Sequence, residues 1–388
     1  MKKLFKTILL VAFGAMAFTA CQGGEGNEGE VQLSAKETAL KAAVAPYINK
    51  VVVPTYKGMA DNALLLADKC NEMLEAGVSG ITADMVKQAQ GYWLKSRDYW
   101  EKSEAFLFGA AADYNIDPHI DSWPLDHNKL QTVLDLLKAG QNLEAVDFGN
   151  GLLGFHSIEY MLFELSADGT TSAPRTTFAA EELVFLAAVA DDLAAQCALL
   201  EQAWAGEVSA EKSALLEAAE LEASRNYGEE MQNAGQAGSL YKTYQEAAEE
   251  IIDGCVTIAD EVANTKMGAP YRGVNGQADG DRNYIESPYS LNSIVDFVGN
   301  IISIENVYVG KGVEGGTHTS ISDYIESVNL ALDTKVKTLI DESKSVIAAI
   351  PEPFAKSAGT TATKSAIDKV NELVAALEEV ASELAKNY

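Results

Sequence analysis

The sequence predicts an all-α fold made of two helical bundles. Two proline-free intervals, 175–269 and 289–350, are dominated by alanine, leucine and glutamate, and the alternation expected of strands is scarce. Near the C-terminus, apolar residues are spaced alternately three and four apart, at Ile367, Val370, Val374, Leu377, Ala381 and Leu384. This spacing places them on one helix face, which we expect to pack in the core.

The first 34 residues are predicted to export and anchor the chain. Three lysines among the first six residues precede an apolar run at residues 7–18, which is shorter than the roughly 20 residues that span a bilayer. Small residues then lead to Cys21, as in the lipobox of bacterial lipoproteins. We therefore expect residues 1–20 to be a signal peptide, Cys21 to carry a lipid, and residues 21–34, rich in glycine and glutamate, to form a flexible tether.

The anchor predicts where the mature protein resides. We expect an exported protein held at the outer membrane, on its periplasmic or its cell-surface face. Because no other stretch of the sequence looks long and apolar enough to cross a bilayer, the mature chain is expected to be anchored by its lipid rather than to span the membrane.

Helices are expected along the rest of the chain, with bounds set by prolines, glycines and polar loops. The predicted helices before the C-terminal one are Ala35–Ala76 (bent near Pro46 and Pro54), Ala83–Tyr114, His127–Lys138, Asn142–Leu165, Ala179–Ala205, Ala210–Asn226, Leu240–Thr265, Ser290–Tyr308 and Ser320–Ile350. Thr82 is expected to cap the second of them. A loop-like stretch at residues 168–174 predicts a boundary between a bundle at 35–170 and a larger bundle at 171–388.

Composition excludes some functions and leaves others open. Hydrophobic residues make up 47% of the chain, which is enough for a sizeable core. Loss of the three leader lysines shifts the net charge from −28 to about −31, so the chain should repel nucleic acids and attract cations, although solubility alone also explains the charge. Cys70, Cys197 and Cys255 remain after lipidation, and we expect buried free thiols rather than a disulfide.

The chain has only four histidines, and one of them forms the most informative motif. His156 and Glu159 stand three residues apart in a G-x-H-x-x-E pattern that starts at Gly154. On a helix they share a face, so they could bind one metal ion or simply hydrogen-bond each other, and the spacing alone favours the second. The H-E-x-x-H and H-x-x-E-H patterns of zinc hydrolases are absent from the sequence. So few histidines favour a site rich in oxygen ligands, which suits iron or calcium better than a three-histidine zinc site.

Two further segments place polar residues among aromatic ones. Trp93, Arg97, Trp100 and Glu104 follow one another at helical spacing and form a single stripe. Burying an arginine and a glutamate in such a stripe costs free energy unless the two charges are paired or serve a functional site. We expect Arg97 to orient Glu104 or Glu159 through a charge pair. The second segment is the loop that contains Asp121, Ser122, Trp123, Pro124, Leu125 and Asp126.

Together these segments resemble the imelysin family. The resemblance rests on three motifs in order: the tryptophan, arginine and Glu-Ala-Phe-x-Phe-Gly stretch that ends at Gly109, the Trp-Pro-Leu-Asp loop at 123–126, and Gly-Phe-His-Ser-Ile-Glu-Tyr at 154–160. It is most specific over Trp93–Phe163. It implies an all-α fold of two packed bundles, with the candidate site near their interface around the G-x-H-x-x-E helix. The family includes insulin-cleaving membrane proteases and iron-regulated bacterial lipoproteins.

The motifs and the segments that carry them contain the residues that we expect to form the site. His156 and Glu159 would be metal ligands, and Glu104, Asp121 or Asp126 would supply a further ligand or a base. Arg97, Trp123 and Gly154 would orient them. The metal could be iron, calcium or zinc. The three other histidines, His119, His127 and His318, are expected to be exposed or at most peripheral to the site.

Three functions from different classes remain open. The first is a lipid-anchored binding component for the uptake of a metal, above all iron, or of haem, in contact with other uptake-system proteins. The second is a metallopeptidase that uses the His156 and Glu159 helix. The third is a non-catalytic interaction protein in which these residues form only a structural polar cluster. We favour the first, because a lipid anchor and a single His–Glu turn suit capture better than turnover.

Overall fold

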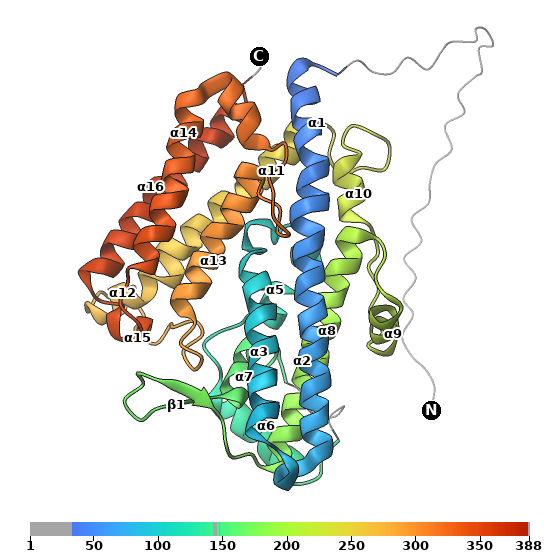
Figure 1. Ribbon diagram of the computed structural model, residues 1–388, viewed down its shortest axis with the longest axis vertical. Coiled ribbons are helices and arrows are strands. Elements are labelled where there is room, and N and C mark those ends of the chain that lie inside the picture. The colour runs from blue at the N-terminus through green and yellow to red at the C-terminus, as the bar shows by residue number, and fades with distance from the viewer. Residues whose placement is uncertain (1–32, 143–145, 147, 387–388) are drawn as a thin grey trace, which may run out of the picture.

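The computed structural model describes residues 33–142, 146 and 148–386, and it is helical almost throughout (Figure 1). This confirms the predicted all-α class. Cys21, the predicted signal peptide at residues 1–20 and the tether up to residue 32 lie outside the described residues, so these expectations stay predictions.

The helices and strands follow one another along the chain, with 3₁₀ and π segments marked η. The first half contains α1 (Ala35–Tyr47), η1 (Ile48–Val52), α2 (Val53–Gly80), α3 (Ala83–Glu101), η2 (Glu104–Phe106), α4 (Ala110–Asp113), α5 (Asp117–Ile120), α6 (His127–Lys138), η4 (Asn150–Leu152), α7 (Phe155–Leu162), β1 (Phe163–Leu165) and β2 (Ser172–Pro174). The second half contains α8 (Ala180–Ala205), α9 (Ala210–Ala218), α10 (Tyr227–Gln232), α11 (Tyr244–Asp260), η5 (Glu261–Lys266), α12 (Gly268–Val274), α13 (Ser293–Glu305), η6 (Asn306–Gly310), α14 (Ile321–Ala348), α15 (Phe354–Ser357) and α16 (Thr361–Leu384).

The first group of helices is built on a long rod formed by α1, η1 and α2, drawn in blue in Figure 1. The predicted bends at Pro46 and Pro54 correspond to the π-helical segment η1, which lies between them. Helices α3 and α8 pack along α2, and α6 and α7 pack against α8. Thr82 caps α3 as predicted, accepting a hydrogen bond of 3.2 Å from the Met85 backbone N–H.

The second group consists of α11, α13, α14 and α16 and lies beside the first in Figure 1. Helix α16 packs against both α14 and α11. Its predicted apolar seam faces the core: Val370, Leu377 and Leu384 are fully buried, and Val374 and Ala381 are partly buried and pack against the same core. The three–four spacing therefore predicted both the helix and its buried face.

Packing crosses the predicted domain boundary at residues 168–174. The chain makes the β1–β2 hairpin there, but the next helix, α8, returns to the first group and packs along α2. The division into bundles at 35–170 and 171–388 stays a prediction. In space, the second group starts only with α11.

Helix α8 contradicts the expectation that no stretch after the leader is long and apolar enough to cross a bilayer. Among the described residues it is the one helix long and apolar enough to cross a bilayer, with a mean hydropathy of 1.8 in its most apolar window. However, 72% of that window is buried inside the protein. The apolar side chains of α8 therefore serve the core, as expected of the central helix of a bundle.

Three predicted helices are wrong in extent. The segment from Asn142 to Leu165 is helical in its described part only at η4 and α7, because glycines at positive φ, Gly149 and Gly154, interrupt it. The segment 83–114 breaks after α3, and the segment 210–226 ends as a helix at Ala218. As predicted, Cys70, Cys197 and Cys255 are buried free thiols.

Candidate metal centre

A cluster of buried charged side chains lies where the two groups of helices meet. The first group contributes residues from α3, η2, α7 and the loop after α5, and the second contributes residues from η5, α13 and the loop before α13. The charged members of this central cluster are Arg97, Glu101, Glu104, Asp121, His156, Glu159, Lys266, Glu286 and Asp296, none of them more than 7% exposed.

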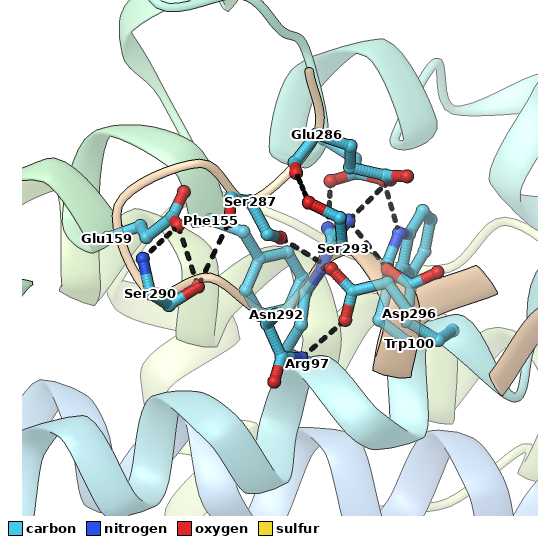
Figure 2. A network of polar contacts seen from close by, with 12 residues as sticks. Arg97, Trp100, Phe155, Glu159, Glu286, Ser287, Ser290, Asn292, Ser293 and Asp296 are labelled. Atoms are coloured by element: carbon cyan, nitrogen blue, oxygen red, sulfur yellow. Dashed lines mark hydrogen bonds and ion pairs between the residues drawn. The ribbon is translucent and has the colours of Figure 1, made fainter. Parts of the chain in front are cut away.

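Arg97, on α3, is at the middle of the central cluster (Figure 2). Its guanidinium pairs with Glu101 at 2.6 Å, with Glu286 at 2.7 Å and with Asp121, and its Nε lies 3.6 Å from Asp296. Although burial disfavours the charge, these carboxylates raise the pKa of Arg97 further above its ordinary value. The predicted pairing of Arg97 with Glu104 or Glu159 is wrong, because carboxylates from the next turn of α3 and from distant loops reach it first.

Asp121 follows the short helix α5, and its carboxylate contacts three other side chains. Its Oδ2 accepts a hydrogen bond of 2.7 Å from the indole N–H of Trp100, and its Oδ1 pairs with Arg97 and lies 3.0 Å from Nε2 of His156. Burial opposes ionisation, but Arg97 and His156 hold the pKa of Asp121 well below its usual range. Asp121 is therefore a carboxylate in the folded protein.

Gly154 brings His156 to Asp121. It precedes α7 with φ of 76°, and a Cβ at this position would lie 1.9 Å from the carbonyl oxygen of Ile120. Only glycine allows α7 to begin this close to the residue before Asp121. The glycine of the G-x-H-x-x-E pattern thus has a steric role in the site.

His156 lies between two carboxylates. Its Nδ1 is 3.4 Å from Glu159 Oε2, and its Nε2 faces Asp121 without making a well-aligned hydrogen bond. Burial favours the neutral ring, but contacts with Asp121 and Glu159 raise the pKa of His156 to about 9. In the absence of another cation the imidazole is therefore protonated at neutral pH.

Lys266, at the end of the π-helical segment η5, is the second permanent cation of the central cluster. Its ammonium lies 3.1 Å from Glu104, 3.0 Å from Glu286 and 3.7 Å from Glu101. Burial opposes the charge, but these three carboxylates raise the pKa of Lys266 well above its ordinary value. Glu104 thus belongs to the cluster, as the sequence suggested, through a lysine that the sequence did not single out.

Trp123 covers the central cluster on its outer side. Its ring centroid is 5.7 Å from that of His156 and 5.2 Å from that of Tyr284, and the Lys266 ammonium lies 5.3 Å from it. Trp123 and Tyr284 are both half-buried and belong to loops. Two loops therefore contribute half-buried aromatic rings to this side of the central cluster.

The loop between α12 and α13 supplies Glu286, which sequence reasoning missed. Figure 2 shows Glu286 between Arg97 and the start of α13, where its backbone oxygen accepts a hydrogen bond from Ser293. Asp296 closes this side, accepting hydrogen bonds of 2.5 Å from Ser287 and from Asn292. No local pattern in the sequence marks Glu286, because its partner Arg97 is 189 residues away.

Glu159 holds this same loop in place. Its Oε1 accepts hydrogen bonds from the backbone N–H groups of Tyr289 and Ser290, at 2.9 and 2.7 Å, and from the Ser290 hydroxyl at 2.7 Å (Figure 2). One oxygen of Glu159 is therefore committed to the loop that carries Glu286, and the other faces His156. In this structure Glu159 positions two other site residues.

The remaining predicted residues lie outside the central cluster. Asp126 is exposed and caps α6, accepting a hydrogen bond of 2.9 Å from Lys129. His127 is exposed and lies 2.8 Å from the Tyr289 hydroxyl. His119 pairs with Asp192 at 2.7 Å, and His318 contacts the backbone of its own loop. Asp126 therefore has a capping role, as expected for an aspartate directly before a helix.

The cluster contains more acid than base. Six buried carboxyl groups, those of Glu101, Glu104, Asp121, Glu159, Glu286 and Asp296, surround two permanent cations and one histidine. Burial and this excess raise the pKa of Asp296 to about 6 and raise the pKa of Glu101 and of Glu104 well above the ordinary range. Among the buried side-chain atoms that lack a hydrogen-bond partner in the described structure are Oε2 of Glu286 and Nε2 of His156.

These two atoms belong to residues that could share one ion. One ligand atom from each of Asp121, His156 and Glu286 lies within 4.8 Å of the others, and the same is true of Glu101, Glu104 and Asp121. The Lys266 ammonium faces both trios, through Glu101 and Glu104 in the second and through Oε1 of Glu286 in the first. The first trio contains an imidazole and two of the unpartnered atoms, so it fits a metal ion better.

Comparison with known proteins agrees with this architecture. The sequence model of the imelysin family matches residues 52–384. Iron-regulated protein A of Synechococcus elongatus is 28% identical over 335 residues, which are 86% of this chain and 82% of that protein. A crystal structure from Parabacteroides distasonis, of a protein proposed to be an iron-regulated protein A precursor, has a TM-score of 0.76 and 27% identity over 92% of this chain and 97% of that one.

A second crystal structure, of an imelysin-like protein from Psychrobacter arcticum, has a TM-score of 0.61 and 14% identity over 89% of this chain and 94% of that one, and so supports the fold alone. The family match extends beyond Trp93–Phe163, where the sequence motifs are found, and includes the segment that carries Lys266, Glu286 and Asp296. The chain belongs to the imelysin family.

Proposed function

We propose that this protein is an exported, lipid-anchored metal-binding component of an uptake system, and that iron is its metal. The observation that carries the proposal is the trio of Asp121, His156 and Glu286: three buried ligand-type side chains within reach of one ion, two of them with unsatisfied atoms. A bound cation would satisfy both atoms and offset the acidic excess around them.

The donor set supports the choice of metal. Two carboxylates and one imidazole suit iron, and they lack the thiolate or the several imidazoles that favour structural zinc. The names of the relatives, iron-regulated protein A in one and a proposed precursor of it in another, point in the same direction. Calcium and zinc are the competing ions, and equilibrium dialysis compares all three directly.

The burial of these ligands favours a bare ion over haem. Asp121, His156 and Glu286 are at most 3% exposed, and Arg97 and Lys266 fill the space beside them. A porphyrin would have to displace both ion-paired side chains. The metal itself would supply Lewis acidity or redox capacity when bound, and His156 would have to lose its proton to become a ligand, so binding should release protons.

The contacts of the candidate bases favour binding over peptide hydrolysis. A hydrolytic base needs a free carboxylate oxygen near a bound water, whereas Glu104 pairs with Lys266, Asp121 pairs with Arg97 and Asp126 caps α6. The proposed location, at the outer membrane through a lipid on Cys21, rests on the order of charge, apolar run, small residues and cysteine in the leader. Uptake-system proteins are the proposed partners.

Equilibrium dialysis of the purified protein against iron, calcium and zinc tests the proposal. We expect one iron per chain for the wild type and loss of binding in His156→Ala and Glu286→Gln. Glu201→Gln is the matched control, because it removes a different buried carboxylate, the partner of Lys212, far from the ligands in the sequence. Equal and negligible uptake by all four proteins, or equal uptake by all four, would overturn the proposal. Metallopeptidase activity would instead appear as chelator-sensitive cleavage of a denatured protein.

A further inference from the structure

One end of the molecule differs from the rest of its surface. The start of α1 from Leu33 to Lys41, the loop at 233–243, the kink of α14 at 328–330 and the end of α16 at 383–386 meet there, at the top of Figure 1. We call this region the tether end, because the described chain begins in it.

Contacts between the segments fix the tether end as one surface. Lys36 donates hydrogen bonds to the backbone of Leu384 and of Lys386, and Glu37 caps the start of α11 through the N–H groups of Tyr244 and Gln245. At the kink of α14, Asn329 donates a hydrogen bond of 2.8 Å to Glu383. Hydrogen bonds therefore join the start of α1 to α11 and to the end of α16, and the end of α16 to the kink of α14.

Exposed leucine and valine side chains concentrate at the tether end. Leu33 is 37% exposed, Leu240 53%, Val328 36% and Leu330 61%. These are four of the ten large hydrophobic side chains that are exposed in the described structure, and the other six belong to α2, α3, α6, α12 and α13. Isolated exposed leucines need no explanation, but a group of them at one end indicates a surface that contacts something apolar.

The segments of this end contain four lysines and two glutamates, although the whole chain carries −28. The carboxylates in this region are occupied: Glu37 caps α11, Glu246 accepts a hydrogen bond from the Lys242 backbone, and Glu383 pairs with Lys386. Lys41 and Lys242 are exposed and line a cleft of about 1120 Å³ together with Leu33 and Tyr244. Lysines around apolar side chains suit an interface with phospholipid headgroups.

We infer that the tether end docks on the surface of the phospholipid bilayer that holds the lipid anchor. The inference rests on the proposed lipidation of Cys21 and goes beyond the proposed metal binding. Only residues 22–32 separate Cys21 from Leu33, a length that spans at most roughly 40 Å when fully extended. The anchor therefore keeps the four apolar side chains within reach of the membrane, and a weak interaction becomes intramolecular.

Docking would fix the orientation of the protein. Helices α1 and α2 run from the tether end to the opposite end, where α6 lies (Figure 1). The bundle would then stand on the membrane, with the end that carries α6 toward the aqueous side (Figure 1).

A fluorescence-quenching experiment on the full lipidated chain tests the inference. The protein is reconstituted in vesicles of phosphatidylethanolamine and phosphatidylglycerol that carry a nitroxide quencher on the headgroup. A thiol-reactive fluorophore is placed at Leu240→Cys or, as the matched control, at Leu136→Cys, an exposed leucine of α6 at the opposite end. The three native thiols are buried, and burial raises the pKa of each, so they do not compete for the reagent.

We expect quenching on the order of twofold at position 240 and little at position 136. Adding Leu33→Gln and Leu330→Gln should relieve the quenching at 240, whereas adding Leu65→Gln and Val78→Gln, two exposed positions elsewhere on the first group, should not. Equal quenching at both labels would overturn the docking and leave the anchor and the metal site standing. A mature protein whose Cys21 carries no lipid by mass spectrometry would overturn both anchor and docking, while dialysis reports on the metal site separately.

Discussion

Replacing Gly154 by alanine should open the candidate metal centre without touching any of its charged groups. The new Cβ would lie 1.9 Å from the Ile120 carbonyl oxygen and 2.2 Å from the carbonyl carbon, both backbone atoms that cannot rotate away. The residue also holds φ of 76°, which costs an L-amino acid about 1–2 kcal/mol. The clash adds about 1–3 kcal/mol as overpacking, so we expect a total loss of about 2–5 kcal/mol in the free energy of unfolding.

The geometry also predicts where the strain is released. Either α7 moves away from Ile120, or α5 moves together with Asp121, which follows it. Both movements separate Nε2 of His156 from Oδ1 of Asp121, which are 3.0 Å apart in the wild type. Metal affinity should therefore fall together with stability. Urea denaturation followed by circular dichroism measures the first quantity, and equilibrium dialysis against iron measures the second.

Gly151→Ala provides the matched control. Gly151 lies three residues earlier in the same segment, a Cβ there meets no atom within 4 Å, and its φ is not positive. We expect its stability and metal affinity to stay at the wild-type values. Unfolding of Gly154→Ala at the wild-type urea concentration, or equal loss of metal by the two variants, would refute the steric role of Gly154.

Three further predictions concern the charges of the central cluster. Arg97→Met should cost about 3–5 kcal/mol in unfolding experiments, because it leaves four carboxylates without their shared cation, whereas Lys57→Met, which breaks an exposed pair, should cost at most about 1 kcal/mol. In metal-free protein, the raised pKa of His156 contributes stability that is complete below pH 6.5 and is lost as the pH rises through about 9. The difference between wild type and His156→Gln in urea titrations should therefore shrink by about 3 kcal/mol from pH 6 to pH 10, and a constant difference would contradict the assignment. Iron at 100 times its dissociation constant should stabilise the wild type by about 2.7 kcal/mol in thermal unfolding, a chelator should reverse the gain, and Glu286→Gln should show neither effect.

Local sequence patterns predicted those parts of the fold that local energetics decide. The helix His127–Lys138 has the predicted bounds, because Asp126 caps its first turn and an apolar face follows at helical spacing. The segment from Asn142 to Leu165 has a helical composition in its second half, but Gly149 and Gly154 take φ values that a helix excludes. The need for Gly154 to approach Ile120 arises from tertiary packing, which no local pattern reports.

The same distinction between local and tertiary contacts explains which site residues could be predicted from the sequence. The His156 and Glu159 pair was found because it spans three residues, within the range where helix geometry fixes which side chains meet. Glu286 and Lys266 were missed because their partners on α3 and η2 are more than a hundred residues away, so only the folded chain brings them together. Asp126 was a candidate as part of the Trp-Pro-Leu-Asp loop, but in the folded chain it caps the first turn of α6.

The distribution of cations over the central cluster suggests why binding and folding should be coupled. Arg97 is on the first group of helices and pairs with Glu286 and Asp296 of the second, while Lys266 is on the second and pairs with Glu104 of the first. Each permanent cation therefore joins the two groups, and a metal ion held by Asp121, His156 and Glu286 would join them a third time. Because removal of one partner of a buried ion pair costs more than the pair contributes, the metal-free contact between the groups depends on Arg97 and Lys266 together. A cation bound at this junction would stabilise the relative position of the helices, and partner proteins could recognise that position as the loaded state.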